Sequence, residues 1–419
     1  MAKFINHTPF DALCYAGYDV KQQEYDVVVC CAEYFLHKID KNIETHILSK
    51  DNHIIEQFYG CAVNDVEPIP LTLTDEFYGE TLLTSVLNES DLSPYKPKCD
   101  IIIQGYAYHK SPTLHFDASF SLYRLDDNNQ LKKLAHKGIS IFGECDWTLN
   151  KDVGSISLNN FTYFYKPTQP KTLSKISLRY EYALGGQNLI THQGDTVYNE
   201  VCYKNPIGIG WLCFDYFDKL KQYEQPIPNR IAMPQILSRG ASLIEPSITK
   251  QSGSMTAKEM AQLAYPNAAT GFGFVHRSWS PRIAKAGTYD EHWLNNIHPF
   301  YPEDFDFNYY NGAPEDQQID FPDLQIPHYL LINNLSPNAG LEAIILPRHR
   351  AFVLISMLGI RVPIPMQVDT IVFDNNKMSL KIVWRTAMLK SFESSEIQLR
   401  FEVDPESPLI KFQGESDES

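Results

Sequence analysis

Residues 271–317 read GFGFVHRSWSPRIAKAGTYDEHWLNNIHPFYPEDFDFNYYNGAPEDQ, and they combine aromatic, acidic, glycine and proline residues more densely than any other part of the chain. The segment has no long apolar run and little periodicity, so helix or strand accounts for only a small part of it. A flexible linker is poor in aromatic residues, whereas this segment is rich in them. We therefore expect an ordered, irregular segment, and ordered loops of this length are often functional.

The charge of this segment favours a protein interface. No Lys or Arg occurs between Lys285 and Arg348, although ten acidic residues lie in that interval. Interfaces are enriched in aromatic residues and depleted of lysine. The sequence also allows the opposite arrangement, in which the segment folds inward over a sheet, and different faces can serve both roles. The candidate partner-binding residues are Tyr289, Trp293, Tyr301, Glu303, Asp304, Asp306, Tyr309 and Tyr310.

The chain on either side of this segment has the patterns of β-strands. Residues 26–36 form a buried apolar run, and residues 114–125 alternate between apolar and polar side chains. Asp374-Asn375-Asn376-Lys377 separates two apolar runs and indicates a hairpin. Short helices are predicted at residues 212–223, at 256–265, where Thr256 and Glu259 form a capping box, and at 290–297, where Thr288 and Glu291 have the same relation. Prolines 226, 228, 234 and 246 indicate an extended connector.

These patterns predict a mainly β protein with an antiparallel, sandwich-like core or two packed β lobes, long ordered loops and few short helices. We expect an N-terminal lobe at residues 1–225 and a C-terminal lobe at 226–412 that carries the 271–317 segment. The acidic end, residues 413–419, is expected to be a disordered tail.

Composition narrows the classes of partner and the compartment. The net charge of −15 argues against nucleic acid or an anionic membrane as the main partner, because both require a basic surface. The N-terminus lacks the apolar core of a secretory signal, and no apolar run reaches the length of a membrane span. Eight scattered cysteines form no CxxC pair, so reduced thiols in the cytoplasm are expected.

The sequence carries no common catalytic signature. GxSxG, HExxH, P-loop and GxGxxG motifs are all missing, so no cofactor is expected. Asp304 and Asp306 share one face of an extended chain, and with His298 they allow a hydrolase or a metal site as an alternative. Turn capping by the carboxylates is the favoured interpretation, and neither a metal site nor a catalytic residue is predicted.

An ordered set of short motifs resembles the bacterial family known as domain of unknown function 2169. The set starts at Ser90-Asp91-Leu92, Lys96-Pro97 and Asp100, and it ends at Leu346-Pro347. A glutamate and a cysteine replace a usual polar pair between Gly143 and Trp147. The motif residues expected to keep the fold are Arg179, Glu181, Gly185, Gly186, Asn205, Pro206, Gly208, Trp279, Arg282, Gly287, Thr288 and Asp290.

The resemblance implies an adaptor, or chaperone, of a type VI secretion system. Such a protein holds a toxic effector in the cytoplasm and loads it onto a VgrG-type spike, often with a PAAR-type tip protein. It implies no catalytic residues and no cofactor, and the net charge already argues against a nucleic acid or membrane partner. Two alternatives remain open at this point: a hydrolase with a carboxylate and histidine site in residues 290–306, and a structural component of the secretion apparatus.

Overall fold

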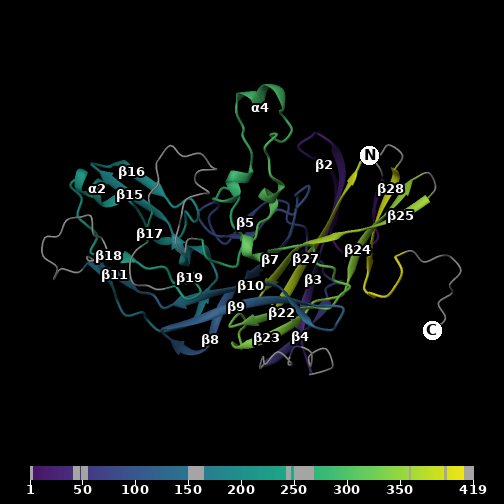
Figure 1. The fold of residues 1–419 in the computed structure, drawn as a ribbon, viewed down its shortest axis with the longest axis horizontal. Helices are drawn as coiled ribbons and strands as arrows, with labels where there is room; N and C mark the ends of the chain where they lie inside the picture. The colour runs from purple at the N-terminus through teal and green to yellow at the C-terminus, as the bar shows by residue number, and fades with distance from the viewer. Residues whose placement is uncertain are drawn as a thin grey trace.

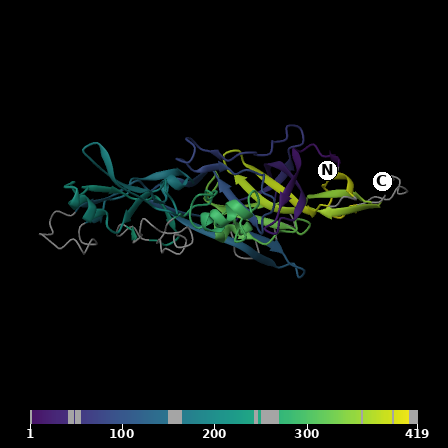
Figure 2. The same ribbon diagram turned by 90° about the horizontal axis from the view of Figure 1, so that it is seen from above.

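The protein is mainly β, as the sequence predicts. The computed structural model describes residues 3–40, 48, 55–149, 165–241, 247–249, 269–357, 360–390 and 394–409. The molecule is elongated, with a wing of small sheets at one end, both marked termini towards the other, and α4 on a projection near the middle (Figures 1 and 2). No helix among the described residues is long and apolar enough to cross a membrane.

The largest element is a curled sheet of twelve strands. Its pairs are mostly antiparallel, but β7 pairs in parallel with β26, and β23 with β4. In spatial order its strands are β19 (Ile236–Ser238), β10 (Leu131–Phe142), β9 (His115–Leu125), β22 (His328–Asn333), β23 (Leu341–Ile345), β4 (Gln57–Val63), β3 (Glu24–Ile39), β27 (Ser379–Leu389), β26 (Gln367–Asp374), β7 (Cys99–Gln104) and β21 (Gln318–Ile319), with β2 (Ala12–Tyr18) also on β3.

Smaller sheets and short helices complete the described fold. A four-stranded sheet joins the two ends of the chain. It contains β1 (Lys3–Asn6), β28 (Ser394–Glu402), β24 (Arg350–Met357) and β25 (Ile360–Pro365). The remaining sheets are β12 (Tyr165–Pro167), β11 (Asp146–Leu149) and β18 (Arg230–Ala232); β14 (Leu184–Gly185), β17 (Ile209–Cys213) and β20 (Ser247–Thr249); and the pairs β13 (Leu173–Ser177) with β8 (Tyr106–Thr113), β15 (Gln187–His192) with β16 (Asp195–Val201), and β5 (Glu76–Phe77) with β6 (Val86–Asn88). The helices are α2 (Tyr216–Gln222), α4 (Glu291–Asn296) and the 3-10 helices η2 (Tyr180–Tyr182), η3 (Arg282–Lys285), η4 (Phe307–Tyr310) and η5 (Glu315–Gln317).

The apolar patterns account for the main strands. Every second residue of β9 from Phe116 to Leu122 is buried, which confirms the predicted alternation. The run in β3 is buried on both faces, so Cys30 packs in the main core while Cys31 packs against Leu71 on the opposite face. The main core fills the inside of the curl and the space between the large sheet and β24 and β28. An ion pair of 2.9 Å between Lys137 on β10 and Asp316 on η5 links the two ends of the curl.

Some local predictions were wrong. The first four residues of the predicted helix at 212–223 are strand and turn, and α2 begins only at Tyr216. The connector at 224–246 contains β18 and β19, which pair with β11 and β10. The helix predicted at 256–265 and the tail at 413–419 lie outside the described residues.

The large sheet takes strands from both sides of residue 225, where the sequence predicted a boundary between two lobes. That boundary stays a prediction. The wing of small sheets has a core of its own, which includes Trp147, Tyr198, Phe217 and Met233. The strands of the wing come from the middle of the chain. The wing is therefore a long insertion between β10 and β19, and β20, which follows β19 in the sequence, adds one edge strand to it.

Candidate partner-binding arm

Residues 287–304, here called the arm, project from the middle of the molecule and carry α4 at their tip (Figure 1). In Figure 2, which looks down on the molecule, the arm is seen end-on in front of its middle, between the wing and the curled sheet. Tyr289 is 54% exposed and Leu294 on α4 is 60% exposed. A projection with exposed rings and apolar side chains is a surface suited to another protein.

The tip of the arm is held together by its own side chains. The carboxylate of Asp290 accepts a hydrogen bond of 2.9 Å from the backbone N–H of Trp293 and so caps α4. The predicted capping box of Thr288 and Glu291 is therefore wrong, because Asp290 is the N-cap. The Trp293 indole donates to the carbonyl of Phe300 at 2.9 Å, and the Tyr289 ring meets it edge-on at 4.7 Å.

A neck closes the base of the arm. Asp304 accepts two hydrogen bonds from Thr288, from the backbone N–H at 2.8 Å and from the hydroxyl at 2.9 Å. Gly287 has a φ of +81°, and a Cβ at this position would lie 3.0 Å from Pro302. Glycine is favoured here because it adopts positive φ without strain and leaves room for the return strand of the loop. Thr288 and Asp304 therefore join the two sides of the arm.

Below the neck, residues 305–310 form an aromatic foot. The buried ring of Phe305 packs on Tyr301 at 4.4 Å and on Phe307 at 5.2 Å. The hydroxyls of Tyr301 and Tyr310 are 2.8 Å apart, and burial raises the pKa of both phenols. Asp306 accepts a hydrogen bond from the backbone N–H of Asn308 and caps η4. The foot is a packed ring cluster rather than a loose loop.

Arg282 ties the foot to the body of the protein. Its guanidinium donates to Glu89 at 2.6 Å, to the carbonyl of Val275 at 2.5 Å and to the carbonyl of Tyr309 at 2.6 and 3.0 Å. Glu89 also pairs with Arg277 at 3.1 Å. Burial alone would raise the pKa of Glu89, but the two guanidiniums hold it below its usual value.

Asp100 anchors the chain just after the foot. It pairs with Lys96 at 3.0 Å and accepts hydrogen bonds from the side chain of Asn311 at 3.0 Å and from the backbone N–H groups of Gly312 and Ala313 at 2.8 and 3.2 Å. Two motif elements far apart in sequence therefore meet in one buried network beneath the arm.

The other motif residues meet around Asn205. The side-chain amide of Asn205 donates to the backbone carbonyls of Tyr180 and Leu184. The backbone carbonyl of Asn205 accepts a hydrogen bond from the N–H of Gly186. A Cβ at Gly185 would lie 2.1 Å from the Asn205 carbonyl oxygen, and one at Gly208 would lie 2.4 Å from its amide nitrogen. Close backbone contact therefore requires these two glycines.

Tyr180 connects the Asn205 site to the segment of chain that precedes the arm. Its hydroxyl donates to the carbonyl of Gly273 at 3.0 Å, and its ring meets Trp279 edge-on at 5.4 Å. Arg179 pairs with Glu181, which in turn accepts hydrogen bonds from the backbone and the hydroxyl of Ser85. Pro206 follows Asn205 in a half-buried turn.

A bacterial protein family, described as "Uncharacterized protein conserved in bacteria (DUF2169)", matches residues 54–385. The chain belongs to this family. The match confirms the resemblance drawn from the motifs, and it includes the arm, the neck, the foot and the anchors at Glu89, Asp100 and Asn205. No curated protein and no solved structure was found to match the chain.

The structure divides the predicted partner-binding residues into two groups. Tyr289 and Glu303 are exposed on the arm, whereas Asp304 and Asp306 are exposed but engaged in hydrogen bonds that hold the loop. Trp293 is half-buried in the tip, Tyr301 is half-buried in the arm where it meets the foot, and Tyr309 and Tyr310 are half-buried in the foot. The two arrangements that the sequence left open thus occur together, with an outward arm on an inward foot.

The side chains named for a hydrolase are engaged locally. His298 meets the Trp293 ring edge-on at 5.2 Å, while Asp304 bonds to Thr288 and Asp306 to Asn308. Among the described residues, no group of three or more His, Cys, Asp or Glu side chains could hold a metal ion.

Residues from distant segments also contact the arm and its foot, and sequence reasoning missed them. The Tyr18 ring at the end of β2 meets Phe300 of the arm edge-on at 5.2 Å, and Tyr95 meets Phe307 of the foot at 6.0 Å. The signals in the sequence are isolated tyrosines at a strand end and in a loop, which do not indicate what those segments contact.

Proposed function

We propose that this protein is an adaptor of a type VI secretion system, which binds a toxic effector in the cytoplasm and loads it onto a VgrG-type spike with its PAAR-type tip. The observation that carries the proposal is the arm: an exposed projection of rings and acids, held in one conformation by the neck and foot. The motif resemblance supplies the link to secretion.

Equilibrium binding needs no bond-breaking centre, and the arm fits such a role. Its Tyr289 and Leu294 side chains offer apolar contact, while Glu291 and Glu303 offer negative charge on the same projection. Preorganised loops bind more tightly because less conformational entropy is lost on binding. Charge complementarity then favours a partner with a basic and apolar surface.

Co-purification with the toxin encoded beside this gene tests the proposal. The tagged protein is expected to retain the toxin through size exclusion, and the complex to bind the neighbouring spike protein. Leu294→Ser combined with Glu303→Lys is expected to reduce toxin recovery at least tenfold, because both side chains are exposed on the arm.

The matched control places the same changes away from the arm. Leu189→Ser with Asp195→Lys on the wing hairpin alters a second exposed apolar side chain and a second exposed acid, and it is expected to leave recovery unchanged. Failure of the unaltered protein to retain the toxin or the spike contradicts the proposal. Equal recovery with both double variants would remove the arm as the contact surface.

A further inference from the structure

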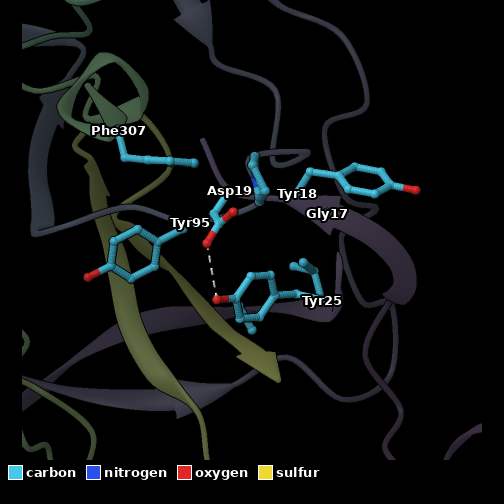
Figure 3. A pocket seen from close by; sticks show the side chains of 9 residues that line it. Gly17, Tyr18, Asp19, Tyr25, Tyr95 and Phe307 are labelled. Atoms are coloured by element: carbon cyan, nitrogen blue, oxygen red, sulfur yellow. Dashed lines mark hydrogen bonds between the residues drawn. The ribbon is translucent and has the colours of Figure 1, made fainter. Parts of the chain in front are cut away.

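A pocket lies beside the foot of the arm. It has a volume of about 350 Å³ and is lined by side chains from β2, β3, β27, the 94–95 loop and the foot. Figure 3 shows Phe307 and Tyr95 on one side of the pocket, and next to them Asp19, whose carboxylate meets the hydroxyl of Tyr25. This volume lies at the low end of ligand pockets, so it suits one large side chain rather than a whole cofactor.

The walls of the pocket are aromatic and apolar. Tyr25, Tyr95 and Phe307 contribute rings, and Val27, Pro94 and Ala387 contribute aliphatic surface. Tyr18 borders the pocket and contacts Phe300, so the arm itself continues one wall outward. Flat rings around an opening are the surface on which a planar cation stacks.

The shape of the pocket is fixed by the protein beneath it. Arg385 on β27 donates to the carbonyls of Asp91 and Ser93 at 2.7 and 2.6 Å, and the Tyr15 hydroxyl donates to the Ser93 carbonyl at 2.7 Å. These bonds hold the loop before Pro94 against β2. Gly17 packs so closely that a Cβ there would lie 2.9 Å from Pro94. The pocket is therefore preformed, which favours binding.

One carboxylate is positioned at this aromatic opening. Among the described residues that line the pocket, Asp19 alone carries a charge. Its Oδ1 accepts from the backbone N–H groups of Lys21 and Gln23, while Oδ2 receives from the described part of the chain only a long hydrogen bond of 3.4 Å, donated by the Tyr25 hydroxyl. The nearby Lys390 is paired with Glu24. Oδ2 thus keeps accepting capacity for a cationic donor.

We propose that this pocket receives an arginine side chain of the polypeptide that the protein binds. The guanidinium stacks between the rings and donates to Oδ2 of Asp19, and its methylene stem lies on the exposed Ala387. Arginine fits better than lysine because its planar guanidinium stacks on aromatic rings and can donate two parallel hydrogen bonds to a carboxylate. The acidic arm and the net charge of −15 favour the same approach of a basic segment. This proposal deepens the proposed function and depends on it for the identity of the partner.

Peptide titration tests the pocket without the toxin. The probes are acetyl-Gly-Arg-Gly-amide and acetyl-Gly-citrulline-Gly-amide, which have nearly the same shape but differ in charge, and binding is followed by saturation-transfer NMR. The arginine peptide is expected to bind at least tenfold more tightly than the citrulline peptide. The preference is expected to vanish with Asp19→Asn, which keeps an oxygen for the Lys21 and Gln23 N–H groups and so preserves the turn.

A second variant tests the site by shape. Ala387 is exposed, so Ala387→Phe fills the pocket without disturbing the core, and it is expected to abolish binding of both peptides. Equal affinity for the two peptides, or binding unaffected by either variant, overturns the pocket proposal while leaving toxin recovery as a separate test of the adaptor function. Retention of the arginine preference in Ala387→Phe would place the arginine elsewhere.

Discussion

Arg282 is 3% exposed and binds three separate segments of the chain: Glu89, Val275 and Tyr309. Removing one partner of a buried ion pair leaves an uncompensated charge, which costs about 3–5 kcal/mol. We therefore expect Arg282→Ala to lower the free energy of unfolding by about that amount in urea titration. Lys285→Ala on the same 3-10 helix removes only a surface pair with Glu315 and is expected to cost at most about 1 kcal/mol. Equal losses would contradict the anchoring role of Arg282.

The burial of His328 leads to a prediction of how the stability of the protein depends on pH. It is 1% exposed, and burial lowers its pKa, with the nearby Arg124 acting in the same direction and its bond to the Ile326 carbonyl opposing it. The unfolded chain therefore binds a proton at a pH where the folded chain does not, so stability is lost as pH falls below about 6.5. We expect the melting temperature to fall between pH 7 and pH 5.

The same histidine supplies the control for this dependence. His328→Gln removes one titrating group. It is expected to reduce the loss of unfolding free energy on acidification by up to about 1.4 kcal/mol per pH unit. The decline is not expected to vanish, because burial also lowers the pKa of His276 and His349. If the unfolding free energy of His328→Gln and of the unaltered protein had the same dependence on pH, His328 would be excluded as a contributor.

At the scale of the element, Thr288 and Asp304 join the two sides of the arm at its neck. Asp304→Ala removes both hydrogen bonds to Thr288, each worth about 1 kcal/mol, and frees the two sides of the neck. We expect faster amide exchange and faster proteolysis within residues 288–303, with little change in melting temperature, because the arm adds little to the core. Glu303→Ala, one residue earlier and also exposed, serves as the control. Unchanged exchange in Asp304→Ala would mean that the foot alone holds the arm.

Elements with strong local patterns could be predicted from the sequence, and contacts between distant segments could not. Alternation in β9 and the Asp374–Lys377 turn, which joins β26 and β27, depend on neighbouring residues. Turn capping by Asp304 and Asp306 was also predicted, although the bond from Asp304 to Thr288 spans sixteen residues. The pocket beside the foot was missed because Asp19, Tyr95 and Phe307 meet only after the sheet has formed. Such proximity leaves no periodic signal in one sequence.

At the scale of the whole molecule, the pairing of strands joins the two halves of the chain. β3 pairs with β27, β9 with β22, β7 with β26 and β4 with β23, so each half supplies neighbours to the other across the large sheet. β1 near the N-terminus pairs in parallel with β28 near the C-terminal end of the described chain. An isolated half would expose the edges of several apolar strands, which favours aggregation.

This interleaving predicts one cooperative unit for the sheet. Fragments 1–225 and 226–419, expressed separately, are expected to be insoluble or to lack a cooperative thermal transition, because neither retains the neighbours of its central strands. Co-expression of the two fragments is expected to restore a soluble complex, since the break at residue 225 lies in the turn after α2 and outside the large sheet. Circular dichroism melting of each fragment and of the complex is the measurement. A soluble 1–225 fragment that melts cooperatively would contradict this account and favour separate lobes.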